Sequence, residues 1–227
     1  RYILGVYALY ERLTANFPHV LFESCASGGG RFDPGILYYA PQGWASDDSD
    51  AAERLKIQYG SSFCYPVSSM GAHVSAVPNH QANRRTPLAT RGNVACFGAF
   101  GYELDLTKLS PEEREEVRRQ IAFVKEYREV LQFGDFYRIL SPFDGNFTAW
   151  MAVSPDKRTA LVGLYKVLNE VNGPFRRLKL QGLNPEFCYT VNGADTHFGD
   201  ELMCAGLVTT DSVIIDQTAG KGFSFDF

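Results

Sequence analysis

The order of helix-type and strand-type patterns along the chain constrains its fold more than any other feature of the sequence. Up to Gly134, amphipathic stretches with a helical period alternate with short apolar runs of the strand type. This alternation is typical of parallel α/β units. Beyond Gly134 the chain changes to short β-type runs separated by turn signals such as "SPDK" and "VNG". The sequence therefore predicts an α/β domain over residues 1–133 and an antiparallel β-sandwich domain over residues 134–227.

Apolar stripes and caps place three helices in the first region. Their predicted ranges are residues 2–14, residues 51–59 and residues 111–133. The last has the clearest start, because Ser110 and Glu113 have the spacing of a capping box and Pro111 takes the first helical position. Asp50 and Glu53 have the same spacing before the second helix.

Continuous apolar runs predict the strands. In the first region they are "HVLFES" (19–24), which is typical of a fully buried strand, "GWAS" (43–46), "SFCYPV" (62–67) and "NVACFGAFGYELD" (93–105). In the second they are residues 147–154, 158–167, 175–183, 186–193, 201–208 and 222–227. The segment 68–87 has loop chemistry and unusual length, which indicates a functional loop. We expect the second region to close its own core through Trp150, Leu161, Leu164 and Leu180.

Composition and charge exclude two classes of partner. With 45% hydrophobic and 21% charged positions, the 227 residues can bury a core. The net charge of -4 argues against a nucleic-acid surface, which needs clustered Lys and Arg. No apolar stretch approaches the roughly 20 residues that cross a bilayer. The five cysteines are widely spaced and offer no metal-binding pattern, so they predict buried thiols in a reducing compartment, and hence a cytoplasmic protein.

Polar and glycine-rich loops follow two of the predicted strands. Cys25 closes the first run and glycines follow at 28–30, while Asp47, Asp48 and Asp50 follow the second. In a barrel of parallel α/β units such loops meet at one face and carry the chemistry, and glycines let a ligand approach the backbone. Two alternatives remain: a flexible glycine loop, and acids that cap a helix. Asp50 fits the cap best, and the spacing of a calcium-binding EF-hand loop is absent.

Three consecutive motifs resemble those of the α-galactosidases of glycoside hydrolase family 36. They are "LFESCASGGGRFDPG" (21–35), "WASDDSDAAERLKIQYG" (44–60) and "GAHVSAVPNHQ" (71–81), and the resemblance extends through almost the whole chain. It implies the second half of a (β/α)8 TIM-type barrel, strands five to eight, followed by a C-terminal antiparallel β-domain. It also implies hydrolysis of terminal α-D-galactosyl residues from melibiose- and raffinose-type sugars, without cofactor or metal, by a homo-oligomer as large as a tetramer.

The same resemblance assigns roles to individual residues. The family uses a retaining mechanism with two aspartates, and Asp47 matches the acid/base, for which burial beside Trp44 favours the protonated form. Cys25 and Ser27 match positions that line the galactose pocket, with Gly28 in the same wall. Ser27 replaces a glycine of some relatives, which narrows the pocket floor. Trp44 is a candidate platform for a sugar face, with a role in the barrel core as the alternative.

One catalytic group is expected to lie outside this sequence. The resemblance places the nucleophile in a Lys-x-Asp-x-Asn segment just upstream of Arg1, and nothing in residues 1–227 replaces it. Asp48 stands where relatives can carry an amide, so it is not the expected acid. We therefore expect a catalytically silent piece of a longer enzyme.

Two other classes of function are alternatives to a hydrolase. A transglycosylase of the raffinose-synthase type would share the barrel and differ in its acceptor site. A carbohydrate-binding module would need only the second region, and an acid at Asp47 disfavours it. In the long loop, His73 and His80 are expected to hold loop carbonyls rather than a sugar. Arg31 is expected to hold a carboxylate around the site, with an ordinary structural pairing with Asp33 as the alternative.

Overall fold

The structure is a computed structural model that describes residues 1–168, 176–193, 195–209 and 224–226. In the first region the helices are α1 Tyr2–Asn16, α2 Pro34–Tyr39, α3 Ala51–Ser61, α4 Leu88–Ala95 and α5 Pro111–Phe133, with 3-10 turns η1 Val67–Ser69 and η2 Leu106–Lys108. The strands between them are β1 Glu23–Ser24, β2 Gln42–Gly43, β3 Gly71–Ser75 and β4 Ala99–Glu103. The α/β alternation is therefore confirmed, although the strands are short.

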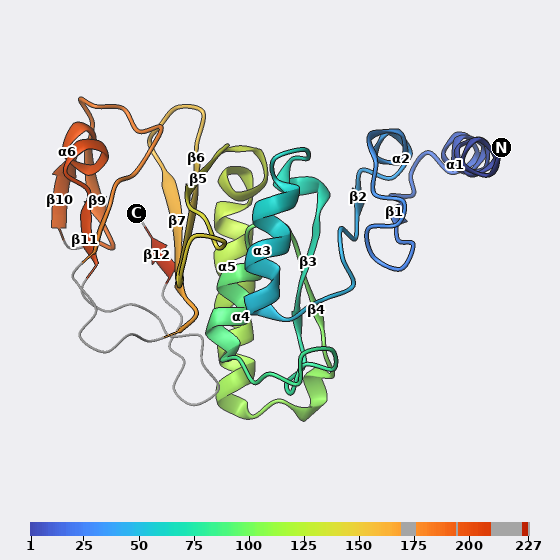
Figure 1. Ribbon diagram of the computed structural model, residues 1–227, viewed down its shortest axis with the longest axis horizontal. Helices are drawn as coiled ribbons and strands as arrows, with labels where there is room; N and C mark the ends of the chain where they lie inside the picture. Colours follow the sequence, from blue (N-terminus) through green and yellow to red (C-terminus); the bar gives the residue numbers. More distant parts are fainter. Residues whose placement is uncertain (169–175, 194, 210–223, 227) are drawn as a thin grey trace.

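The four strands of the first region lie in chain order and are parallel. β1 pairs with β2, and β3 pairs with β4. A parallel bridge between Gly43 and Met70 joins the two pairs. Helices α3, α4 and α5 lie between the β3–β4 pair and the sheet of the second region, while α1 and α2 lie at the far end (Figure 1). The carboxyl ends of parallel neighbours share one edge, so the loops after β1, β2 and β3 meet there.

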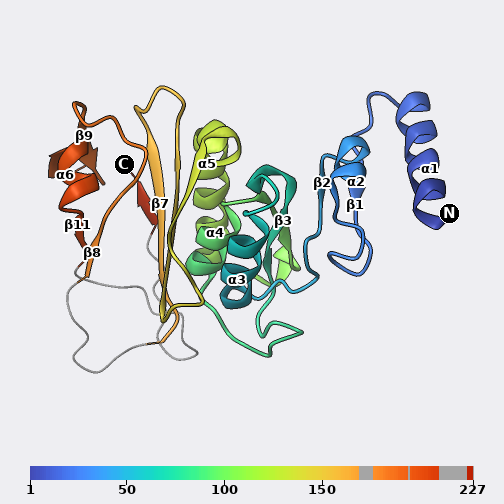
Figure 2. The same cartoon turned by 45° about the horizontal axis from the view of Figure 1, so that its top comes forward.

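The second region is built on antiparallel pairs. Its strands are β5 Asp135–Leu140, β6 Phe147–Val153, β7 Ala160–Lys166, β8 Arg176–Leu178, β9 Cys188–Val191, β10 Asp195–Phe198, β11 Leu207–Thr209 and β12 Ser224–Asp226, with one helix, α6 Gly199–Cys204. The central sheet has the order β12–β7–β6–β5. The pairs β8–β11 and β9–β10 lie on the side of this sheet away from α5 (Figure 2).

Both faces of the central sheet are buried, and this corrects the predicted core. Leu164 and Leu180 pack inside the second region, as expected. Trp150 and Leu161 point to the other face, where they pack with Leu55 and residues of α4 and α5. Side chains alternate along a strand, so a sheet covered on both sides divides its apolar residues between two cores. The two regions therefore share one apolar cluster.

Helix α5 confirms the capping signal read from the sequence. The Ser110 hydroxyl accepts a hydrogen bond from the Glu113 N–H at 3.2 Å, and the Glu113 carboxylate accepts one from the Ser110 N–H at 2.9 Å. Val117, Val124 and Leu131 are the buried apolar side chains of the helix. Their seven-residue spacing puts them on one stripe. Val124 and Leu131 face the shared core, and Val117 packs with residues of β3 and α4 in a separate cluster.

Three predicted strands are misplaced. The run 19–24 pairs only at Glu23 and Ser24, and it is not buried: Val20 is 53% and Leu21 72% exposed, because no described residue covers them. The run 62–67 is a turn that leads into η1, and the strand follows at 71–75, inside the segment expected to be a loop. The start of the run 93–105 belongs to α4, and only Ala99–Glu103 is a strand.

Further differences lie in the second region and near β2. The run 201–208 is mostly helix α6, followed by β11. β5 and β10 were not predicted, and the strand expected at 43–46 ends at Gly43. No helix among the described residues is long and apolar enough to cross a membrane.

Candidate active site

The loops after β1 and β2 meet at Asp47. The Cys25 thiol follows β1 and lies 3.8 Å from Oδ1 of Asp47, which follows β2. Both side chains are exposed, so the burial of Asp47 expected from the sequence is not provided by the described residues. The arrangement places a thiol and a carboxylate together at the carboxyl edge of the parallel strands.

Gly28 brings the glycine loop against the backbone of the Asp47 loop. Its φ is +71° and it is buried; a Cβ there would lie 2.7 Å from the Asp47 nitrogen and 2.9 Å from the Ser46 Cα. Glycine is therefore required by the close approach of two backbones. The neighbouring Ser27 is exposed with a φ of 50°, an uncommon conformation for a side chain with a Cβ. The glycine at 28 thus permits the close approach of the two loops beside Asp47. Contact of this residue with a ligand stays a prediction.

The other two acids of this loop have structural partners. The Asp48 carboxylate accepts a hydrogen bond from the Asp50 N–H at 2.9 Å. Asp50 caps α3 by accepting from the N–H groups of residues 52 and 53, and it forms an ion pair with Arg84. The helix-cap alternative therefore holds for Asp50, and the cap does not involve the Asp47 carboxylate. The described residues contain no group of three side chains suited to a metal ion.

A buried arginine joins the Asp47 loop to β3. Arg54 is 2% exposed, and its guanidinium donates hydrogen bonds to the carbonyls of Ser46 and Gly71. Burial lowers the pKa of Arg54 to about 10, although the negative charge of Asp48 acts in the opposite direction and raises it. The guanidinium therefore stays cationic at neutral pH. The buried charge is thus satisfied mainly by the carbonyl groups of Ser46, in the loop after β2, and of Gly71, the first residue of β3, which ties these two segments together.

Trp44 lies between this arginine and His73. The Arg54 guanidinium is 5.8 Å from the indole centre, and the His73 ring meets the indole edge-on at 4.6 Å. Burial lowers the pKa of His73, so the ring is neutral at pH 7. Trp44 remains partly exposed, which leaves room for both of its predicted roles. His80, by contrast, is exposed in the loop after β3.

Arg31 does not bind a carboxylate within the described residues. Its guanidinium donates to the Cys25 carbonyl at 3.0 Å and to the Tyr2 hydroxyl at 3.1 Å. Asp33 instead caps α2 and accepts a hydrogen bond from the Tyr7 hydroxyl at 2.8 Å. Arg31 therefore holds the backbone of the Cys25 loop.

The cysteines differ from the predicted buried thiols. None of the five forms a disulfide bond with another described residue, and only Cys96 is buried. Cys25, Cys64, Cys188 and Cys204 are exposed. Neighbours along the chain were therefore a poor guide to burial here.

One residue that contacts the Asp47 loop was not singled out from the sequence. The Gln81 side chain donates to the Asp47 carbonyl at 2.9 Å and accepts from the Ser49 N–H at 3.1 Å. Gln81 lies 34 positions further along the chain. It is the last residue of the motif "GAHVSAVPNHQ", and the motif and the length of this segment were the signals that could have found it.

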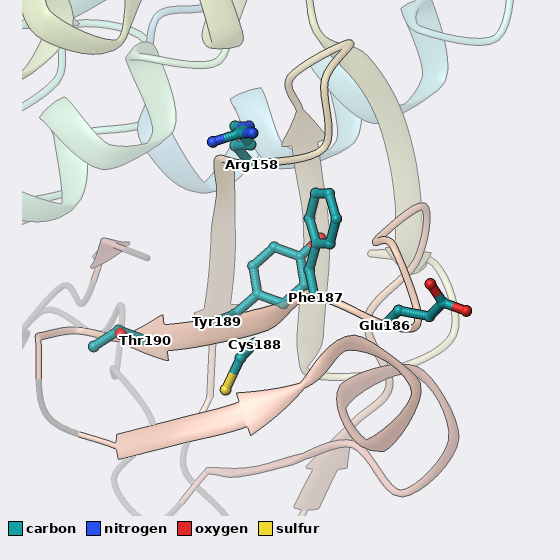
Figure 3. Close-up of a pocket in the computed structure, with 6 residues that line it drawn as sticks. All are labelled: Arg158, Glu186, Phe187, Cys188, Tyr189 and Thr190. Carbon is teal, nitrogen blue, oxygen red and sulfur yellow. The ribbon is translucent and has the colours of Figure 1, made fainter.

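A separate cavity lies in the second region (Figure 3). It has a volume of about 580 Å³ and is lined by Arg158, Glu186, Phe187, Cys188, Tyr189 and Thr190. The Tyr189 hydroxyl is already used within the fold, since it donates to the Lys157 carbonyl and accepts from the Asn184 N–H. We therefore place the candidate site at the strand edge around Asp47, where the polar groups converge.

Comparison with known proteins decides the family. The melibiase family model matches residues 1–134. The chain belongs to the melibiase family. The model of the glycosyl hydrolase family 36 C-terminal domain matches residues 147–221 of this melibiase-family chain, so the resemblance read from the three motifs is confirmed.

Curated relatives and solved structures of this family are α-galactosidases. The chain is 56% identical over 207 residues to α-galactosidase AgaA of Geobacillus stearothermophilus, covering 91% of the chain and 28% of that protein. It is 46% identical over 226 residues to α-galactosidase 1 of Pediococcus pentosaceus, covering 99% and 31%. A crystal structure of an AgaA variant in complex with raffinose superimposes with a TM-score of 0.94 at 51% identity, covering 99% and 31%. The chain thus spans about 30% of the length of these relatives.

Proposed function

We propose that the longer protein to which this chain corresponds hydrolyses terminal α-D-galactosyl residues from sugars of the melibiose and raffinose type. The relatives are named α-galactosidases, and one of them is solved with raffinose. On this proposal, residues 1–133 form the second half of a (β/α)8 barrel and residues 134–227 its C-terminal β-domain. This assignment is supported by the four parallel strands, which lie in chain order and have helices between them.

Asp47 is proposed as the general acid/base of a retaining mechanism. The observation that carries this role is the position of its carboxylate at the carboxyl edge of β2, 3.8 Å from the Cys25 thiol. Retaining glycosidases need a second carboxyl group about 5–5.5 Å from the first, across the scissile bond. Asp48 and Asp50 hold the backbone of the loop and α3, so we assign the nucleophile to a segment outside this chain. That segment would also bury Asp47.

One wall of the galactose pocket is proposed to come from this chain. Cys25, Ser27 and the backbone at Gly28 would line it, because Cys25 and Gly28 lie next to Asp47 and Ser27 stands between them in the chain. Trp44 would offer the exposed part of its ring to a sugar face. Ser27 is exposed, and its side chain would narrow the floor of the pocket relative to glycine.

The stereochemistry of the reaction tests the proposed mechanism. In the longer protein, an aryl α-galactoside should release galactose first as the α-anomer, because two displacements restore the configuration. Proton NMR of the anomeric region during the first minutes of turnover would detect it before mutarotation mixes the anomers. Release of the β-anomer first would show a single displacement and would overturn the retaining mechanism.

Gly28→Ala should misplace Asp47 in the longer protein. The alanine must keep a φ near +71° and its Cβ would meet backbone atoms of residues 46 and 47, so the Asp47 loop must move. A displacement of about 1 Å at a catalytic group costs on the order of a hundredfold in rate, and we expect that loss in kcat.

Gly193→Ala is the matched control for this change. Gly193 has a φ of +70°, but nothing lies within 4 Å of the Cβ that alanine would add. Both variants should lose about 1–2 kcal/mol of stability from the left-handed conformation, measured by denaturant unfolding. Gly28→Ala should lose more than Gly193→Ala, because its Cβ also meets backbone atoms. Only Gly28→Ala should lose turnover; equal activity of the two variants would contradict the positioning role of Gly28.

A further inference from the structure

In the loop after β3, hydrogen bonds hold the segment 79–84 in place beside Asp47. At its base Asn79 is 2% exposed, and all of its side-chain capacity is used. Its amide donates to the hydroxyls of Ser49 and Ser75, each at 3.3 Å, and its carbonyl oxygen accepts from the N–H groups of Gln81 and Ala82, each at 2.9 Å. A buried, fully bonded amide of this kind holds its surroundings in one arrangement.

The segment 79–84 is also bonded to α3, at Arg84. Arg84 forms an ion pair with Asp50, the cap of α3, and lies 3.5 Å from the Glu53 carboxylate. The Asn79 N–H also donates to the Arg84 carbonyl at 2.9 Å. The segment between Asn79 and Arg84 is therefore fixed at both ends, and Gln81 projects from the middle of it.

Gln81 links this fixed segment to the Asp47 loop by hydrogen bonds. Its amide group makes two hydrogen bonds to one short backbone stretch: it donates to the Asp47 carbonyl and accepts from the Ser49 N–H. The two bonds use both ends of a planar amide, so they fix the orientation of the backbone as well as its position. The same stretch begins at the Asp47 nitrogen, which would lie 2.7 Å from a Cβ added at Gly28.

We propose that Gln81 is a positioning residue for Asp47, which holds the backbone of the acid so that its carboxyl group reaches the departing oxygen of the substrate. This inference rests on the acid/base role proposed above. An aspartate side chain has only two rotatable bonds, so the backbone determines where its carboxyl group can lie. Because Gln81 is itself exposed, its removal disturbs the Asp47 loop without opening a cavity in the core.

The experiment is Gln81→Met in the longer protein, since methionine has similar length and no amide. The rate of the first, glycosylation step is measured with raffinose and with aryl α-galactosides whose leaving groups differ in acidity. A misplaced acid harms mainly the substrates that need protonation. We expect about a tenfold loss with raffinose and a loss of less than threefold with a nitrophenyl galactoside, with an unchanged thermal midpoint.

Gln42→Met is the matched control. Gln42 also lies near this strand edge, and its amide donates to the Glu23 carboxylate at 2.8 Å, without contact to Asp47. It should show the same small effect on every substrate. A Gln81→Met loss that is uniform across leaving groups, or no loss at all, would overturn the inference.

Asp47→Asn, measured on the same substrates, separates the two proposals. If its losses depend on the leaving group and those of Gln81→Met do not, only the role of Gln81 is wrong. If Asp47→Asn itself shows no such dependence, the acid/base assignment fails and the inference on Gln81 falls with it.

Discussion

Asp47→Asn is expected to lower the turnover of raffinose by on the order of a thousandfold in the longer protein, within the range usual for the loss of a general acid. Asparagine keeps the shape of the side chain but has no proton to give to the departing sugar oxygen. Aryl galactosides with acidic leaving groups should lose much less in the glycosylation step, because their oxygen departs without full protonation. Pre-steady-state measurement of the released phenol isolates that step.

Asp48→Asn provides the matched control for this change. Asp48 uses Oδ1 to accept from the Asp50 N–H, and an amide oxygen can do the same. The adjacent acid-to-amide change should therefore leave turnover within about threefold of the unaltered protein, since a neutral acceptor replaces a charged one. Equal glycosylation-step losses for raffinose and aryl substrates in Asp47→Asn would argue against the acid role.

Local signals in the sequence predicted local structure well. Ser110 and Glu113 lie three residues apart, and Asp50 directly precedes its helix, so the caps of α5 and α3 depend on atoms a few positions away. The meeting of Cys25 with Asp47 followed from a general property of parallel strands, whose carboxyl ends share one edge. These parts needed no knowledge of distant contacts.

The misplaced strands depend on contacts that the sequence does not show. The run 62–67 has β-type residues, yet the strand forms at 71–75, where small residues allow close packing. A Cβ at Gly98 would lie 2.6 Å from the Cβ of Ala72, so the turn before β4 presses directly on β3. Close packing of this kind selects glycine and alanine, which the strand propensity scale disfavours.

The hydrogen bonds that hold the candidate acid in place could not be predicted from local sequence patterns either. Gln81 reaches Asp47 across 34 positions, and Arg54 bonds the Gly71 carbonyl across 17. Both residues lie within the motifs that resemble family 36, but the resemblance assigned no role to either. Each acts through backbone carbonyls, which every residue has, so their role is visible only once the loops are placed in space.

The exposed apolar side chains near the N-terminal end of the chain predict that the isolated chain associates in solution. Tyr2, Leu4 and Leu21 are exposed, and no residue of α1 is buried. In Figures 1 and 2 this helix stands apart from the layers around α3 to α5. A contiguous apolar surface next to unpaired strand edges favours association with other chains. The proposed barrel explains it, because the preceding strands and helices would cover it.

The isolated chain of residues 1–227 is therefore expected to show no turnover of an aryl α-galactoside and to associate in solution. A retaining mechanism needs two carboxyl groups across the scissile bond, and near Asp47 the other acids hold the chain itself: Asp48 accepts from the backbone and Asp50 caps α3. Light scattering at several protein concentrations measures the association, and the longer protein assayed in parallel is the positive control. Clear activity from a monodisperse monomer would place a nucleophile within this sequence and would overturn the assignment of the chain to the second half of a barrel.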